Sequence, residues 1–115
     1  MPYFSIQTNQ SIADNTIAEI GKKASAFIAA IVGKPEAYVM TAVKAGVPMT
    51  FAGNDAPAAF VELKSVGLPE DQCSALAGKI SGFVQTELAI EPNRVFIDLV
   101  DLPRTRFAWN GKTFG

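Results

Sequence analysis

The 115-residue sequence contains no histidine and only one cysteine, Cys73. Acid–base catalysis by histidine, zinc sites built from histidine and cysteine, and an intrachain disulfide are therefore excluded. Nothing in the composition points to a bound metal ion or another cofactor, and we expect neither. Any chemistry that this chain performs must use other groups.

Charged residues and long hydrophobic runs are also scarce. Ten Lys and Arg against eleven Asp and Glu give a net charge of −1, without the basic excess that nucleic-acid binding requires. The longest nearly apolar run, Ala24 to Val32, is far shorter than the roughly 20 residues that span a bilayer. The first ten residues lack the pattern of a secretory signal. We therefore expect a cytoplasmic protein that binds neither nucleic acid nor membrane.

Hydrophobic residues, by contrast, are abundant, at 49% of the chain, while charged residues make up 18%. The charged share lies below the usual quarter for soluble domains. A chain of 115 residues has room for one domain, so we expect a single domain over residues 1–115. The apolar excess predicts that part of its surface is buried between chains.

The second half of the sequence repeats the layout of the first. Pro35 and Pro92 each precede a β-rich run, and they lie 57 positions apart, which is about half the chain. The same offset pairs the strand-like segment 3–8 with the segment 60–65. The pattern indicates two copies of one unit, at about residues 2–57 and 58–115.

An amphipathic helix is predicted between the two strands of the first half. Apolar residues recur every three or four positions from Ile17 to Ile31, as one buried face of a helix requires. Asp14 or Asn15 can cap the start of this helix, and Gly33 is suited to end it.

The second half contains a matching helical pattern. Pro69 is suited to the first position of a helix, and the apolar spacing continues to Leu88. We therefore expect a helix from about Pro69 to Leu88. Cys73 falls on its apolar face and is expected to be an inert buried residue.

Strand, helix and strand in each half predict an α/β (α+β) fold. Two βαβ units would form one four-stranded mixed sheet with both helices on one face. The segments 39–43 and 95–100 are apolar at almost every position, which predicts that both faces of these strands are shielded. Since two helices cover only one face, another copy of the chain is expected on the other. Residues 101–115 are expected to form short strands against a neighbouring subunit.

Pro2 is the first candidate for chemistry. Removal of the initiator Met1 would leave Pro2 with a free secondary amine. An N-terminal amine titrates at about 7.7–8.0, and burial among apolar groups lowers that pKa toward neutrality. Such an amine is a general base that needs no histidine. The alternative is that Pro2 simply begins the first strand, where its missing N–H is tolerated.

Six ordered motifs over nearly the whole chain resemble the macrophage migration inhibitory factor family of the tautomerase superfamily. The motifs are Met1-Pro2, Gly33-Lys34-Pro35 with Tyr38, Phe51-Ala52-Gly53, Ser65-Val66-Gly67, Asn93-Arg94-Val95-Phe96-Ile97, and Trp109-Asn110-Gly111-Lys112-Thr113-Phe114. The resemblance implies the tautomerase fold, with two βαβ units per chain, and a homotrimer with sites at its subunit interfaces.

The resemblance also implies keto–enol tautomerase activity, an isomerase reaction on small aromatic keto or enol acids such as phenylpyruvate and dopachrome-like compounds. Pro2 would be the general acid/base. Lys34 would pair with the substrate carboxylate and lower the pKa of the proline, although its charge can equally stabilise the end of the first helix. Val66 would offer its backbone N–H to the substrate, or is simply a residue at a strand end.

Five aromatic residues match the family's pocket wall, although core packing is the alternative for each of them. They are Tyr38, Phe96, Phe107, Trp109 and Phe114.

Two substrate-binding positions depart from the family pattern. Phe96 replaces a common tyrosine, and Asp98 replaces a common asparagine. A carboxylate at position 98 would raise the pKa of the proline and repel an anionic substrate, unless Arg94, Arg104 or Arg106 offsets its charge. We therefore expect weaker activity than in the strongest family members.

Two other functions remain open. One is a non-catalytic signalling or interaction trimer with a vestigial pocket. The joint presence of Pro2, Lys34 and the aromatic wall argues against it. The other is a related decarboxylase or dehalogenase, for which Arg104 and Arg106 would be the extra arginine partners. The Cys-x-x-Cys pair of the animal members is replaced by Ala58-Ala59-Phe60-Val61, so no thiol oxidoreductase activity is expected.

Overall fold

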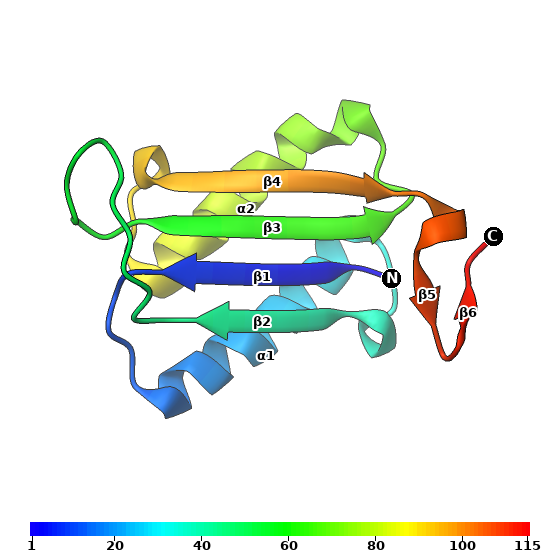
Figure 1. Cartoon of the computed structure of the whole chain (residues 1–115), viewed down its shortest axis with the longest axis horizontal. Helices are drawn as coiled ribbons and strands as arrows, with labels where there is room; N and C mark the ends of the chain where they lie inside the picture. Colours follow the sequence, from blue (N-terminus) through cyan, green and yellow to red (C-terminus); the bar gives the residue numbers. More distant parts are fainter.

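Each half of the chain forms a strand, a helix and a second strand. The computed structural model describes all residues from 1 to 115. The first half holds β1 (Tyr3–Thr8), α1 (Asp14–Val32) and β2 (Met40–Lys44), and the second holds β3 (Ala59–Val66), α2 (Cys73–Leu88) and β4 (Val95–Leu102). Figure 1 shows the four strands as one sheet.

The sheet is mixed, with strand order β2-β1-β3-β4. Within each half the two strands are parallel, because a helix connects them. The two halves meet at the centre, where β1 and β3 pair antiparallel. Tyr3 at the start of β1 therefore lies between Met40 of β2 and Lys64 of β3. This arrangement confirms the predicted fold of two βαβ units.

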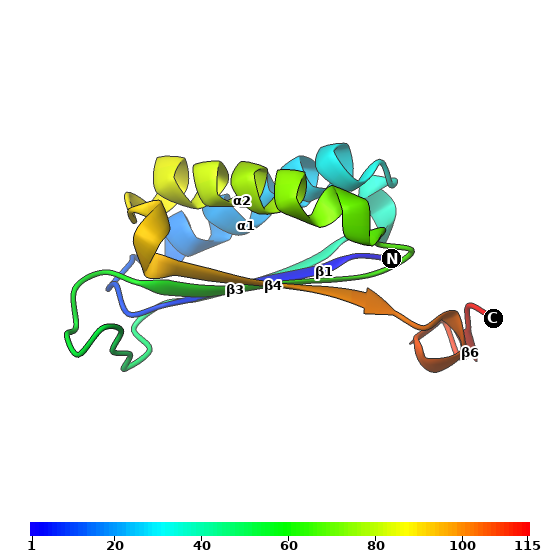
Figure 2. The ribbon, with the colours of Figure 1, turned by 90° about the horizontal axis from the view of Figure 1, so that it is seen from above.

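Both helices pack on the same face of the sheet, as Figure 2 shows. Their apolar stripes meet the inward side chains of the central strands, and the rings of Phe27 and Phe83 stack between the helices at 4.6 Å. Neither helix is long and apolar enough to cross a membrane. The most deeply buried core side chains are Phe4, Ile6, Ala24, Ile28, Val61, Leu63, Ile80, Val84 and Ile90.

The opposite face of the sheet is uncovered in the single chain. Met40 is 67% exposed, Phe96 57% and Phe60 40%, although all three are large hydrophobic residues. Along β2, exposed residues alternate with partly buried ones. The apolar runs thus have one face on the core and one face in solvent, because the chain has only the two helices to cover them.

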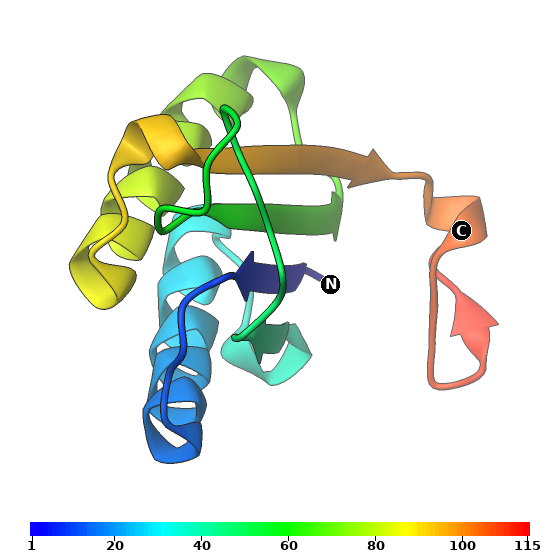
Figure 3. The same cartoon turned by 60° about the vertical axis from the view of Figure 1, so that its left-hand side comes forward.

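The last residues form a small hairpin that stands apart from the main sheet. It consists of β5 (Ala108–Trp109) and β6 (Lys112–Thr113), which pair only with each other. Figures 1 and 3 show it beyond the end of β4, projecting away from the helices. The short strands predicted for this segment are present, while their contact with a neighbouring subunit stays a prediction.

The start of α1 differs from the sequence expectation. Ala13 is the N-cap and makes no side-chain capping bond, while Asp14 is already the first helical residue. The Asn15 amide oxygen accepts a hydrogen bond from the adjacent Thr16 N–H. Neither predicted residue caps the helix, because both lie inside its first turn.

The start of α2 also differs. The backbone of Pro69 is extended, and a single 3-10 turn, Glu70–Gln72, follows it before the α-helix begins at Cys73. Cys73 is therefore in the first turn of the helix and is partly exposed, not buried as expected. The first buried residue of α2 is Leu76, one turn further along.

The two helices end differently, and this difference gives a test of the fold. Gly33 ends α1 with φ 67°, but Ala89 ends α2 with φ 55°. A side chain in this left-handed region is strained. We expect Ala89→Gly to raise the free energy of unfolding by about 0.5–1 kcal/mol.

Ala18→Gly is the matched control, because the residue is exposed but lies inside α1. This substitution should lower the free energy of unfolding by about 1 kcal/mol. Urea denaturation at one protein concentration measures both changes. A loss of stability in both variants would contradict the assignment of Ala89 to the helix end.

Candidate active site at the N-terminus of β1

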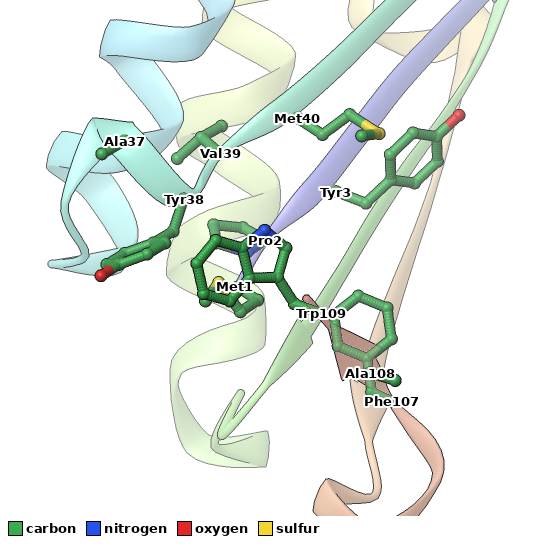
Figure 4. A pocket seen from close by; sticks show the side chains of 10 residues that line it. All are labelled: Met1, Pro2, Tyr3, Ala37, Tyr38, Val39, Met40, Phe107, Ala108 and Trp109. Atoms are coloured by element: carbon green, nitrogen blue, oxygen red, sulfur yellow. The ribbon is translucent and has the colours of Figure 1, made fainter. Parts of the chain in front are cut away.

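A pocket of about 360 Å³ lies where the N-terminus meets the start of β2 and the C-terminal hairpin. This volume is at the lower end of the range for small-molecule sites. Nine of its ten lining residues are hydrophobic. Figure 4 shows them: Met1, Pro2, Tyr3, Ala37, Tyr38, Val39, Met40, Phe107, Ala108 and Trp109.

Pro2 is fixed at this pocket by the sheet. Its carbonyl oxygen accepts a hydrogen bond from the Met40 N–H at 3.0 Å, which extends the β1–β2 pairing by one step. The Pro2 side chain is less than 2% exposed. Because β1 has a strand on each side, its first residues cannot turn away from the pocket.

The electrostatics of the pocket favour a neutral amine. Burial lowers the pKa of the N-terminal ammonium, here that of Met1, and the positive charge of Lys34 lowers this pKa further. Both effects disfavour the protonated form. A neutral amine has a free electron pair and can accept a proton.

Lys34 lies beside the pocket rather than in its lining. It directly follows Gly33 at the end of α1, and its Nζ donates a hydrogen bond to the Val66 carbonyl oxygen at 2.7 Å. The structure thus brings Lys34 and Val66 together at the end of β3 that neighbours the N-terminus. The observed contact uses the carbonyl of Val66, whereas the sequence prediction concerned its N–H.

Three of the predicted aromatic residues line the pocket. The rings of Tyr38 and Trp109 pack edge to face at 5.6 Å, and Phe107 lies in the adjacent segment of the hairpin. Phe114 is outside the lining but stacks on Phe107 at 5.8 Å. Trp109 is 55% exposed, so the aromatic wall is open on one side.

Phe96 and Asp98 lie away from Pro2 in the single chain. They are on the uncovered face of β4, where Phe96 pairs with Phe60 and packs against Phe51 at 5.1 Å. Since β4 runs antiparallel to β1, the first residues of β4 lie at the opposite end of the sheet from Pro2. One chain therefore does not assemble all the predicted substrate-binding residues.

The three arginines do not reach Asp98 or the pocket. The Arg94 guanidinium donates to the carbonyl oxygens of Phe51, Ala56 and Pro57, and so holds the loop before β3. Arg104 and Arg106 are exposed in a 3-10 turn after β4.

Besides Met1, sequence reasoning missed five lining residues, of which Tyr3 and Met40 are the largest. They are paired in the β1–β2 register, so their side chains project from the same face, where Figure 4 shows them together. Aligning the predicted starts of the first two strands as a parallel pair would have placed Tyr3 and Met40 side by side. Across the chain, no group of three or more acidic, cysteine or histidine side chains could hold a metal ion.

The whole chain, residues 1–115, matches the family model described as macrophage migration inhibitory factor (MIF). It is 41% identical to a macrophage migration inhibitory factor homolog from Brugia malayi over 100% of both chains. It is 30% identical to macrophage migration inhibitory factor from Mus musculus over 99% of each.

A solved structure of a macrophage migration inhibitory factor homologue from Prochlorococcus marinus superposes with a TM-score of 0.91. That pair shares 35% identity over 98% of this chain and 99% of that one. The Trichinella spiralis structure gives a TM-score of 0.89 at 30% identity, over 97% and 99%. The chain thus belongs to the macrophage migration inhibitory factor family.

The electrostatic role of Lys34 can be tested directly. We expect Lys34→Met to raise the pKa of the N-terminal amine, because a nearby positive charge that disfavours protonation is removed. Reductive ¹³C-methylation of the amine, followed by NMR titration of the chain that retains Met1, measures this pKa. Lys22→Met, at an exposed position of α1, is the control and should leave the pKa in place. Equal values in the two variants would contradict the effect.

Proposed function

We propose that the protein is a keto–enol tautomerase of small aromatic keto acids, with phenylpyruvate and dopachrome-like compounds as the substrate class. Pro2, freed by removal of Met1, is the general acid/base. The observation that carries this proposal is a fully buried Pro2 at the start of β1, in an apolar pocket beside a lysine. Membership of a tautomerase-fold family supports an isomerase reaction.

In this mechanism the Pro2 nitrogen takes a proton from the carbon next to the keto group. The electron pair of that C–H bond forms the C=C bond of the enol, and the carbonyl electron pair moves to oxygen. The protonated proline then delivers its proton to that oxygen, so the net change is an isomerisation. The apolar lining keeps the amine neutral between turnovers.

The substrate carboxylate would pair with the Lys34 ammonium, which retains two N–H donors besides the one given to Val66. The aryl group would lie against Tyr38 and Trp109, whose edge-to-face arrangement leaves ring faces open. This placement orients the reacting carbon toward Pro2.

The active unit in this proposal is a homotrimer. The uncovered sheet face and the isolated β5–β6 hairpin support association, since both expose hydrophobic residues in the single chain. A neighbouring subunit would then supply Phe96 and Asp98, which lie too far along the sheet to reach Pro2 of their own chain.

The role of the proline nitrogen gives the first activity test. Inserting an alanine between Met1 and Pro2 keeps the proline but converts its nitrogen into an amide, which cannot accept a proton. We expect phenylpyruvate tautomerisation to fall by about 10²-fold or more. Pro2→Gly, which keeps an amine of different basicity, should also slow the reaction.

Intact mass spectrometry of the unaltered protein is the control for Met1 removal. Unchanged rates in both variants of a processed protein would rule out Pro2 as the catalytic base.

Asp98 gives a second test. It is exposed and forms no ion pair in the chain, so nothing offsets its charge there. We expect Asp98→Asn to increase kcat/KM for phenylpyruvate severalfold, because a charge that repels the anionic substrate is removed. Asp71→Asn, another exposed aspartate, should leave kcat/KM unchanged. Equal effects of the two substitutions would place Asp98 outside the site.

A further inference from the structure

Asp101 holds the turn that follows β3. It lies in β4 opposite Ser65 of β3. Its Oδ1 atom accepts hydrogen bonds from the N–H groups of Gly67 at 3.1 Å and Leu68 at 3.0 Å. One carboxylate oxygen therefore satisfies two consecutive backbone donors, and a charged acceptor makes such bonds stronger than neutral ones.

The turn connects Asp101 to Lys34 through a single peptide group. The Gly67 N–H and the Val66 carbonyl belong to the same peptide, and no peptide bond in the chain is cis. In a trans peptide the N–H and C=O point in opposite directions. Asp101 binds the N–H on one side, and this directs the Val66 oxygen toward Lys34 Nζ, 2.7 Å away on the other side.

Two further features restrict this peptide. Gly67 has φ 74°, a left-handed conformation that turns the chain sharply after β3. A side-chain carbon placed on Gly67 would lie 3.8 Å from Lys34 Nζ, so the lysine packs directly over the turn. The negative charge of Asp101 also polarises the peptide and strengthens the Val66 carbonyl as an acceptor.

We propose that Asp101 is a positioning residue for Lys34, acting through the Val66–Gly67 peptide to hold the ammonium where it receives the substrate carboxylate. The inference rests on the proposed function in that it takes Lys34 as the carboxylate-binding group. Asp101 itself touches no substrate. Without its carboxylate, the Gly67 and Leu68 amides lose their acceptor. The Val66–Gly67 peptide is then held only through its carbonyl oxygen, by Lys34 and the Ser65 hydroxyl.

The test compares phenylpyruvate with its methyl ester, in which a methyl group on the carboxyl oxygen removes the carboxylate charge. We expect Asp101→Ala to raise KM for phenylpyruvate about tenfold, with kcat changed less than twofold and the ester unaffected. Asp101→Asn keeps an oxygen acceptor for both amides and should restore most of the wild-type KM. Asp71→Ala, at an exposed aspartate in the 3-10 turn before α2, is the matched control.

A double-mutant cycle separates positioning from general loosening. In the Lys34→Ala background, Asp101→Ala should add no further increase in KM, because the ammonium that Asp101 positions is absent. A fully additive effect, or an equal loss with acid and ester, would overturn the proposal. If Asp101→Ala does not fold, Asp101→Ser replaces it, since a hydroxyl is too short to accept from both amides.

Binding distinguishes this inference from the proposed function. If the wild type turns over neither substrate, the tautomerase proposal fails, but the Kd of 3-phenylpropanoate still reports on Lys34. A Kd that is higher than the wild-type value in Asp101→Ala, but close to it in Asp101→Asn, would support the role of Asp101. Equal Kd values in the wild type and Asp101→Ala would overturn it.

Discussion

The parallel pairing of β1 with β2 is the constraint on which the site depends. The hydrogen bond from the Met40 N–H to the Pro2 carbonyl carries this pairing to the N-terminal residues, while β3 holds β1 from the other side. An N-terminus is normally one of the most mobile parts of a chain. Here the sheet buries Pro2 and places it against the segment that precedes β2 and the hairpin that follows β4.

The same arrangement favours a neutral amine at the N-terminus of a chain that has no histidine. Two separate parts of the fold lower the pKa of the N-terminal amine, which in this chain belongs to Met1: the apolar surroundings by burial and Lys34 by its charge. Lys34 is itself held by Val66, which ends β3, and that turn is held by Asp101 of β4. The end of every strand in the sheet thus contributes to the surroundings of one nitrogen atom.

The spacing of apolar residues was sufficient to predict both helices, because burial determines that periodicity. The β-rich runs that recur 57 positions apart predicted the four strands. The helix starts were less predictable: Pro69 is extended and precedes a 3-10 turn, and Asp14 lies inside α1. Pro2, Lys34 and Tyr38 could be proposed from local motifs. The distance of Phe96 from Pro2 could not, since it follows from the antiparallel pairing of the two halves. Met40 was missed because its pairing with Tyr3 depends on the register between β1 and β2, which the pattern within either segment alone does not give.

The central claim is that the Pro2 nitrogen is the catalytic base, and the pKa of that nitrogen tests it most directly. Selective ¹⁵N labelling of proline in the Met1-free protein allows the Pro2 amine to be titrated by NMR. The account predicts a pKa below that of an ordinary N-terminal amine, equal to the acidic limb of kcat/KM for phenylpyruvate. An unshifted pKa, or one that differs from the kinetic value, would contradict the account.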